Sequence, residues 1–179
     1  MRIIAGAWKG RRLDAPRWEG LRPTSDKLRE TLFNVIARRV PGTRVLDAFA
    51  GTGALGLEAL SRGADSAVFV EKDRRAAALI AVNADRCGAR DRCAIIRGTA
   101  EQVLQHAIAG DPFDLVMLDP PYTFEPLADV VLAAARHLAP GGVIVLEHAT
   151  RRALPVLDGL RSVRTIRSGD STLTLFEAA

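Results

Sequence analysis

The sequence has few of the features of secreted, membrane-spanning or metal-dependent proteins. Only two of its 179 residues are cysteine, which is too few for a disulfide framework. The spacing of the two cysteines and three histidines matches no metal-ligand motif. No apolar run approaches the roughly 18 residues that a membrane-spanning helix needs, and the N-terminal segment is too interrupted for a signal peptide. We therefore expect a cytoplasmic protein without a bound metal, and the length predicts one main core.

Positive charge is unevenly distributed along the chain. Residues 1–29 hold eight Lys/Arg and three Asp/Glu, a balance of +5, whereas residues 30–179 hold seventeen and eighteen, a balance of −1. The net charge of +4 thus originates in an N-terminal arm. A basic stretch of this kind is either a solvated extension or a surface that faces phosphate groups.

Short apolar runs alternate with helical patterns from residue 44 onward. The runs are nearly continuous, as expected of strands that are covered on both faces, and we expect them at 44–50, 66–71, 93–98, 113–119 and 143–148. We expect helices at 54–61, 74–87, 101–109 and 127–138, and Pro140-Gly141-Gly142 would stop the last one. This alternation predicts an α/β fold with a mostly parallel, doubly wound sheet.

The two ends of the chain depart from this alternation. Residues 25–39 have the spacing of an amphipathic helix, and the residues on either side of Lys9-Gly10 have the pattern of a hairpin. Near the C-terminus, residues 163–167 and 172–176 flank a turn so short that the two strands must be antiparallel. We therefore expect seven strands in all, ending in an antiparallel hairpin.

A glycine motif follows the first expected strand. Gly51 and Gly53 allow the backbone to turn tightly and to approach a ligand, and Glu71, twenty positions after Gly51, can accept hydrogen bonds from ribose hydroxyls. A nucleoside-containing cofactor is therefore expected. Asp47 lies where dinucleotide-binding folds usually carry an apolar residue, and its carboxylate could hold the ammonium group of a methionine moiety. A purely structural turn and an NAD-dependent enzyme remain alternatives at this point.

The sequence Asp119-Pro120-Pro121-Tyr122 ends the fourth expected strand. Ligands of open α/β sheets bind outside the carboxyl ends of the strands. A rigid Pro-Pro turn there would present the Asp119 carboxylate, the Pro120 carbonyl and the ring of Tyr122 at fixed positions. Two acceptors and a stacking ring suit an exocyclic amine on a planar group, whereas the alternative is a simple proline strand terminator.

Together, these two motifs resemble the signature of class I S-adenosylmethionine-dependent methyltransferases that modify a planar amine. The chain resembles in particular the RsmD-type guanine-N2 methyltransferases of bacterial 16S ribosomal RNA. This resemblance includes N-terminal blocks that other enzymes with the motif lack, namely Met1-Arg2-Ile3-Ile4-Ala5-Gly6, Lys9-Gly10-Arg11-Arg12-Leu13 and Leu21-Arg22-Pro23-Thr24-Ser25-Asp26. It implies a Rossmann-like methyltransferase domain at 41–179, preceded by an RNA-facing extension at 1–40.

The resemblance implies S-adenosylmethionine as the cofactor and S-adenosylhomocysteine as its product. The methionine end would be held by Asp47, Gly51, Thr52 and Gly53. Glu71 would bind the ribose, and Thr99 and Ala100 would bind the adenine. The catalytic group would be Asp119, Pro120, Pro121 and Tyr122. Most of the catalysis would then be positioning and electrostatics, because Asp119 and the Pro120 carbonyl accept the hydrogens of the amine.

The resemblance also implies a partner, which is 16S ribosomal RNA within a small-subunit particle or an assembly intermediate. The expected RNA contacts are Arg2, Lys9, Arg11, Arg12, Arg22 and Thr24. Trp8 would either stack on a base or pack against the protein. We expect a monomer that does not bind membranes. The alternatives are an amino-methyltransferase acting on adenine or on protein glutamine, and a non-catalytic RNA-binding module.

Overall fold

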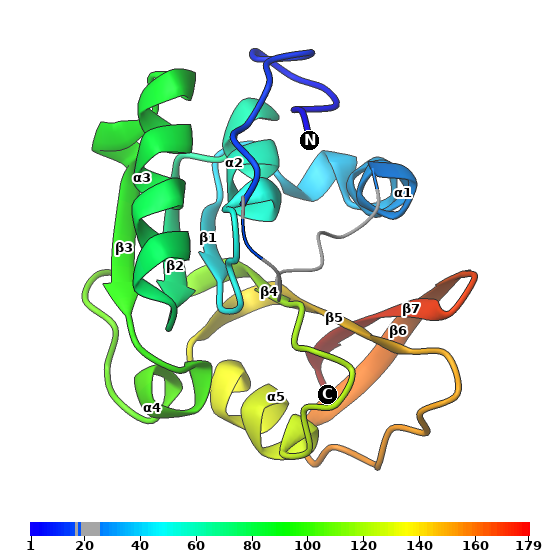
Figure 1. The fold of residues 1–179 in the computed structure, drawn as a ribbon. Helices are drawn as coiled ribbons and strands as arrows, with labels where there is room; N and C mark the ends of the chain where they lie inside the picture. Colours follow the sequence, from blue (N-terminus) through cyan, green and yellow to red (C-terminus); the bar gives the residue numbers. More distant parts are fainter. Residues whose placement is uncertain (17, 19–25) are drawn as a thin grey trace.

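A single seven-stranded sheet organises the molecule in the computed structural model, which describes residues 1–16, 18 and 26–179 (Figure 1). The strands are β1 (Arg44–Asp47), β2 (Ser66–Glu71), β3 (Cys93–Arg97), β4 (Phe113–Leu118), β5 (Leu138–Ala149), β6 (Leu160–Ser168) and β7 (Ser171–Ala178). Their order is β3-β2-β1-β4-β5-β7-β6. The first five run parallel, whereas β7 pairs antiparallel with both β5 and β6. The predicted α/β sheet ending in an antiparallel hairpin is confirmed.

Helices cover both faces of the sheet. They are α1 (Asp26–Val35), η1 (Ala37–Arg39), α2 (Ala54–Ser61), α3 (Arg74–Cys87), η2 (Arg90–Arg92), α4 (Ala100–Leu104) and α5 (Leu127–Ala135). Helices α1, α2 and α3 lie over one face, and α4 and α5 lie over the other (Figure 1). Successive strand residues therefore alternate between two cores, with Val45 in the first and Leu46 in the second, because side chains of a strand point to opposite faces. No helix in the described part of the chain is long and apolar enough to cross a membrane.

Several predicted element boundaries were wrong, each for a local reason. Strand β1 ends at Asp47 rather than at residue 50, because the chain then leaves the strand for the glycine turn. Helix α4 ends at Leu104 rather than at residue 109. Helix α5 ends at Ala135, and residues 140–142 lie inside β5 rather than after a helix. Gly141 has a φ of 78°, and the pairing of β4 with β5 shifts register near this point.

The N-terminal hairpin, residues 1–16, packs against α2 and α3. It is closed by an antiparallel bridge between Arg2 and Arg12. Ile3 is fully buried in the same core cluster as Val45. The backbone N–H groups of Ile4 and Ala5 donate to the buried Glu58 carboxylate, at 2.7 and 3.0 Å.

Hydrogen bonds of the Asn83 side chain also connect the second half of the hairpin to α3. The Asp14 N–H donates to Asn83 Oδ1 at 2.7 Å, and the Asn83 side chain donates to the Asp14 carbonyl at 3.2 Å. Trp8 packs against the core, with the Arg92 guanidinium 5.2 Å from its ring centroid. The hydrophobic core therefore extends across residue 40, and the division at that point remains a prediction about function.

Replacing Ile3 by alanine should lower the free energy of unfolding by about 2–5 kcal/mol, because it opens a cavity in a core that the hairpin shares with the sheet. Denaturant unfolding measures this change directly. Val156→Ala is the matched control, since the Val156 side chain is 94% exposed and its removal should change stability by less than about 0.5 kcal/mol. Equal stability of Ile3→Ala and the control would contradict a shared core.

Candidate active site

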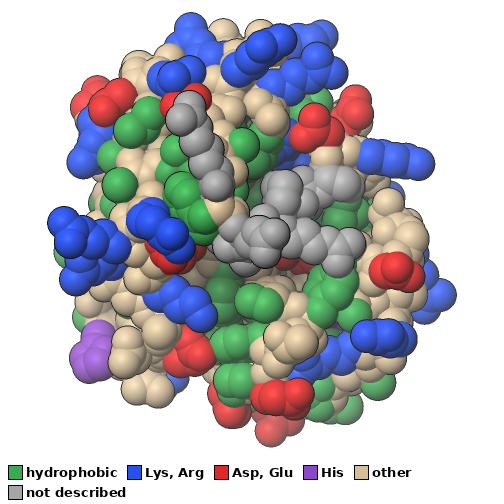
Figure 2. Space-filling view, viewed as in Figure 1, with side chains coloured by type: hydrophobic (Ala, Val, Ile, Leu, Met, Phe, Trp, Pro, Cys, Tyr) green, Lys and Arg blue, Asp and Glu red, His purple; other side chains and the backbone are tan. Residues whose placement is uncertain are grey.

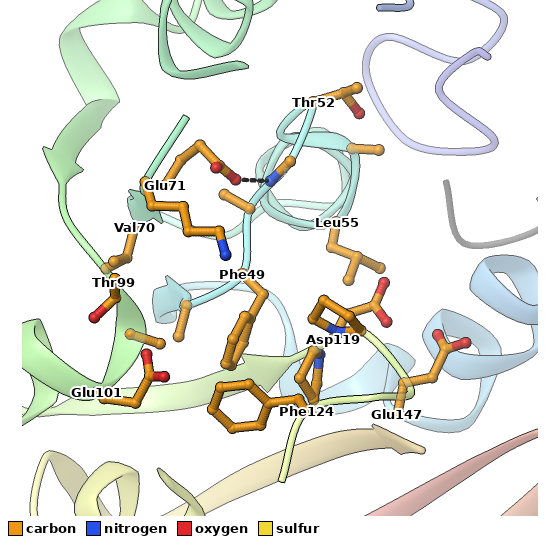
Figure 3. Close-up of a pocket in the computed structure, with 18 of the residues that line it drawn as sticks. Phe49, Thr52, Leu55, Val70, Glu71, Thr99, Glu101, Asp119, Phe124 and Glu147 are labelled. Carbon is orange, nitrogen blue, oxygen red and sulfur yellow. Dashed lines mark hydrogen bonds between the residues drawn. The ribbon is translucent and has the colours of Figure 1, made fainter. Parts of the chain in front are cut away.

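A cavity of about 650 Å³ opens at the carboxyl ends of the parallel strands (Figure 3). Both sequence motifs contribute to its wall. The predicted site residues that line it are Gly51, Thr52, Glu71, Thr99, Ala100, Asp119, Pro120, Pro121 and Tyr122. This volume is within the usual range for small-molecule and cofactor sites.

Of the remaining predicted site residues, those that the structure describes do not line this cavity. Asp47 lies beneath the glycine turn, whereas Gly53 lies within the turn, directly before α2. The four basic residues Arg2, Lys9, Arg11 and Arg12 are exposed on the N-terminal hairpin. Arg22 and Thr24 fall outside the described residues.

The glycine turn is fixed by the carboxylate of Glu71. Gly51 and Gly53 have φ values of 54° and 78°, in the left-handed region that favours glycine. The Gly51 N–H donates to Glu71 Oε2 and the Asp73 N–H donates to Glu71 Oε1, both at 2.8 Å. Because each carboxylate oxygen can accept a second hydrogen bond, Glu71 can hold the turn and also bind hydroxyl groups.

Asp47 is a buried acceptor under the same turn. Its Oδ2 accepts from the Gly56 N–H at 3.0 Å, and its Oδ1 has no hydrogen-bond partner among the residues that the structure describes. Burial raises the pKa of Asp47 to about 7, against the lowering effect of the Gly56 bond, and the charges of Asp119 and Glu71 raise it further. A cation placed nearby would favour the ionised form of this carboxylate.

The loop that follows Asp119 is held at both ends. The hydroxyl group of Tyr122 donates to Glu147 Oε1 at 3.3 Å and shares a hydrogen bond with Ser171 Oγ. The Arg152 guanidinium donates to the backbone carbonyls of residues 124 and 125. The ring of Tyr122 is therefore positioned by partners on β5 and β7, far away in the sequence.

Two phenylalanine rings divide the cavity. The rings of Phe49 and Phe124 meet edge to face, with centroids 5.3 Å apart and planes at 77°. In Figure 3 they lie between the side that carries Thr99 and Glu101 and the side that carries Asp119. An apolar partition of this kind suits two planar ligands bound on either side.

Sequence reasoning missed several residues that line the cavity, namely Pro16, Phe49, Lys72, Glu101, Phe124, Glu147 and Ser171. Phe49 is inside the glycine motif, so its position could have been inferred. Glu147 and Ser171 lie outside both motifs. The expected strand at 143–148 indicated that Glu147 reaches the carboxyl end of the sheet, whereas only the pairing of β7 with β5 brings Ser171 there.

Comparison with known proteins places the chain in a family. The family model described as Conserved hypothetical protein 95 matches residues 1–177. The chain belongs to this family. The Ribosomal RNA small subunit methyltransferase D of Escherichia coli K12 is 38% identical over 159 residues, which cover 88% of this chain and 79% of that protein. The Haemophilus influenzae protein of the same name is 37% identical over 151 residues, covering 82% and 78%.

Solved structures of similar proteins share the whole fold. The structure of yhhF from Escherichia coli superimposes with a TM-score of 0.87 at 35% identity, covering 99% of this chain and 97% of that chain. A hypothetical protein of Thermus thermophilus gives a TM-score of 0.83 at 35% identity, with 98% coverage of both chains. The resemblance to the RsmD family and the Rossmann-like class I methyltransferase fold is thereby confirmed.

Asp47→Asn should raise the melting temperature at pH 8 and have a smaller effect at pH 5. A carboxyl group whose pKa is higher in the folded than in the unfolded state binds more protons when folded, so the protein loses stability as the pH rises from about 4 to 7. The substitution removes this loss. A gain of about 1 kcal/mol in the free energy of unfolding corresponds to a rise in melting temperature of about 2–4 °C for a domain of this size. Thermal melts at both pH values measure the difference, and a larger gain at pH 5 would contradict the assignment.

Proposed function

We propose that the protein transfers a methyl group from S-adenosylmethionine to the exocyclic amine N2 of a guanine in 16S ribosomal RNA of the small subunit. The observation that carries the proposal is the meeting of two motifs in one cavity. The glycine turn with Glu71 lines one part of the wall, and Asp119-Pro120-Pro121-Tyr122 lines another. Membership of a family whose relatives are named for small-subunit ribosomal RNA methylation supports the substrate class.

The chemistry of the cavity fits the proposed cofactor. Glu71 can accept hydrogen bonds from ribose hydroxyls, and Thr99 and Ala100 line the side where the adenine would lie. The buried Asp47 carboxylate beneath the turn favours a nearby cation such as the ammonium group of the methionine moiety. S-Adenosylmethionine, when bound, supplies an electrophilic methyl group on its sulfonium.

The residues on the other side of the aromatic partition would prepare the amine. An amine conjugated with a planar ring is a poor nucleophile, because its lone pair is delocalised into that ring. Hydrogen bonds from the amine to the Asp119 carboxylate and the Pro120 carbonyl would localise the lone pair on nitrogen. The ring of Tyr122 would stack on a base that has been turned out of its helix, and stacking of this kind is worth about 1–3 kcal/mol.

The exposed basic residues of the N-terminal hairpin would bind phosphates at some distance from the cavity. Ser61, the last residue of α2, accepts hydrogen bonds from the N–H groups of Ala7 and Trp8. Helix α2 begins next to the glycine turn, so the hairpin tip lies about one helix length, roughly 12 Å, from it. In Figure 2, Lys and Arg side chains gather along the upper edge, where Figure 1 shows the hairpin. An RNA strand could bridge this distance with a few nucleotides.

Asp119→Ala should abolish methyl transfer while S-adenosylhomocysteine still binds. Loss of one acceptor should cost about 2.7–4 kcal/mol of transition-state stabilisation, by analogy with removal of an oxyanion-hole donor. Tritiated methyl transfer into small subunits from a strain lacking the enzyme measures the activity, and calorimetry measures ligand affinity. Large subunits are the substrate control. Near-normal single-turnover transfer by the variant would refute the role of Asp119, and transfer to neither subunit by the wild type would refute the proposed function.

Reversing the charge of Arg11 and Arg12 to Glu should weaken RNA binding and leave cofactor affinity intact. Each lost phosphate contact should flatten the log–log salt dependence of binding by roughly 0.7 on single-stranded RNA, so two contacts give about 1.4. Binding to small-subunit RNA across a salt series measures the slope. Arg164→Glu with Arg167→Glu makes the same charge change on β6, at the opposite edge of the sheet. An unchanged slope in the hairpin variant would exclude the RNA-binding role.

A further inference from the structure

We infer that Glu147 determines which base enters the site, by accepting a hydrogen bond from the ring N1–H of guanine beside the amine bound to Asp119. The inference rests on the proposed function, because it concerns the same base in the same cavity. It assigns to a residue of β5 a role that neither sequence motif contains.

The strand register places Glu147 next to Asp119. Strands β4 and β5 are parallel, and Leu118 pairs with Leu146. The residues that follow, Asp119 and Glu147, therefore lie side by side at the carboxyl ends of the two strands. Both carboxylates line the main cavity, and both also line a small adjoining hollow below α1. Figure 3 shows the two side chains on one side of the cavity, beyond Phe49 and Phe124.

Glu147 is held in place within this wall. Glu147 is only 6% exposed, and its Oε1 accepts a hydrogen bond from the Tyr122 hydroxyl group. Tyr122 is also the residue expected to stack on the base, so the acceptor and the stacking ring are fixed relative to each other.

The arrangement of acceptors matches the donors of guanine. Guanine carries three N–H bonds on its pairing edge, two on the N2 amine and one on the adjacent ring nitrogen N1. The Asp119 carboxylate and the Pro120 carbonyl account for the first two, and Glu147 supplies the third acceptor. Adenine and cytosine place a ring-nitrogen lone pair beside their amine, and this lone pair would face the Glu147 carboxylate without a proton between them. A buried acceptor left without its donor lowers affinity for the wrong base.

The analogue 2-aminopurine separates this role from the chemistry of methyl transfer. It keeps the amine at position 2, but its N1 carries a lone pair instead of a hydrogen. Because it also lacks the O6 carbonyl of guanine, the comparison with a Glu147 variant is what assigns the difference to N1. Small-subunit RNA is prepared with guanine or 2-aminopurine at the methylated nucleotide, once that nucleotide has been mapped. In single-turnover assays, the wild type should prefer guanine by about 10- to 100-fold, the range expected for one well-placed base contact.

Glu147→Gln should bring this preference to within about threefold, because a glutamine amide can donate to the N1 of 2-aminopurine. Glu125→Gln is the matched control, since it removes the same charge from an exposed side chain outside the cavity wall and should keep the wild-type preference. A thermal melt with S-adenosylhomocysteine checks that the variants fold.

Binding of RNA with inosine at the target provides a readout that does not depend on activity. Inosine keeps the N1–H but has no amine to methylate, so Glu147→Ala, which leaves no acceptor, should weaken its binding about tenfold or more, whereas Asp119→Ala should change it by less than about threefold. A folded Glu147→Gln variant with the wild-type preference for guanine, or a folded Glu147→Ala variant with unchanged inosine binding, would overturn the inference. Failure of the wild type to methylate guanine RNA would instead refute the proposed function.

Discussion

Four neighbouring parallel strands carry a carboxylate at or next to their carboxyl ends, and these groups meet at one edge of the sheet. They are Asp47 on β1, Glu71 on β2, Asp119 directly after β4 and Glu147 near the end of β5. Burial disfavours ionisation of such groups, and like charges nearby add to this effect. Burial is the main reason why the pKa of Asp47 is raised, and the charges of Asp119 and Glu71 raise it further. The site is therefore rich in acceptors and suited to ligands that bring N–H groups, hydroxyls and positive charge.

The rest of the fold gives these neighbouring carboxylates different hydrogen-bond partners. Glu71 is occupied by the backbone of the glycine turn, and Asp47 by the start of α2. Phe49 and Phe124 separate the expected cofactor side from the side that carries Asp119 and Glu147. One sheet edge can thus support a cofactor site and a base site without mixing their hydrogen-bond partners.

Sequence reasoning identified cavity-lining residues most readily where they belong to a contiguous motif. The glycine turn, Glu71 and the Asp119 loop could be predicted, because each depends on residues close together in the chain. Glu147 lies outside both motifs, and only the expected strand at 143–148 indicated its place. Ser171 could not be predicted, because it reaches the site only through the pairing of β7 with β5. The sequence also did not show that the basic hairpin is bound to the core through Ile3, Glu58 and Asn83, since these contacts join segments more than 50 residues apart.

The chemical identity of the methylated product tests the account most directly. Small subunits isolated without this methylation are incubated with the protein and isotopically labelled S-adenosylmethionine. The 16S ribosomal RNA is then analysed by mass spectrometry both as nuclease fragments and as nucleosides, and the ribosomal proteins are analysed as hydrolysed amino acids. The acceptors around Asp119 and Glu147 predict that the label appears in N2-methylguanosine at one position of 16S ribosomal RNA. Label in N6-methyladenosine, or in methylglutamine of a ribosomal protein, would contradict it.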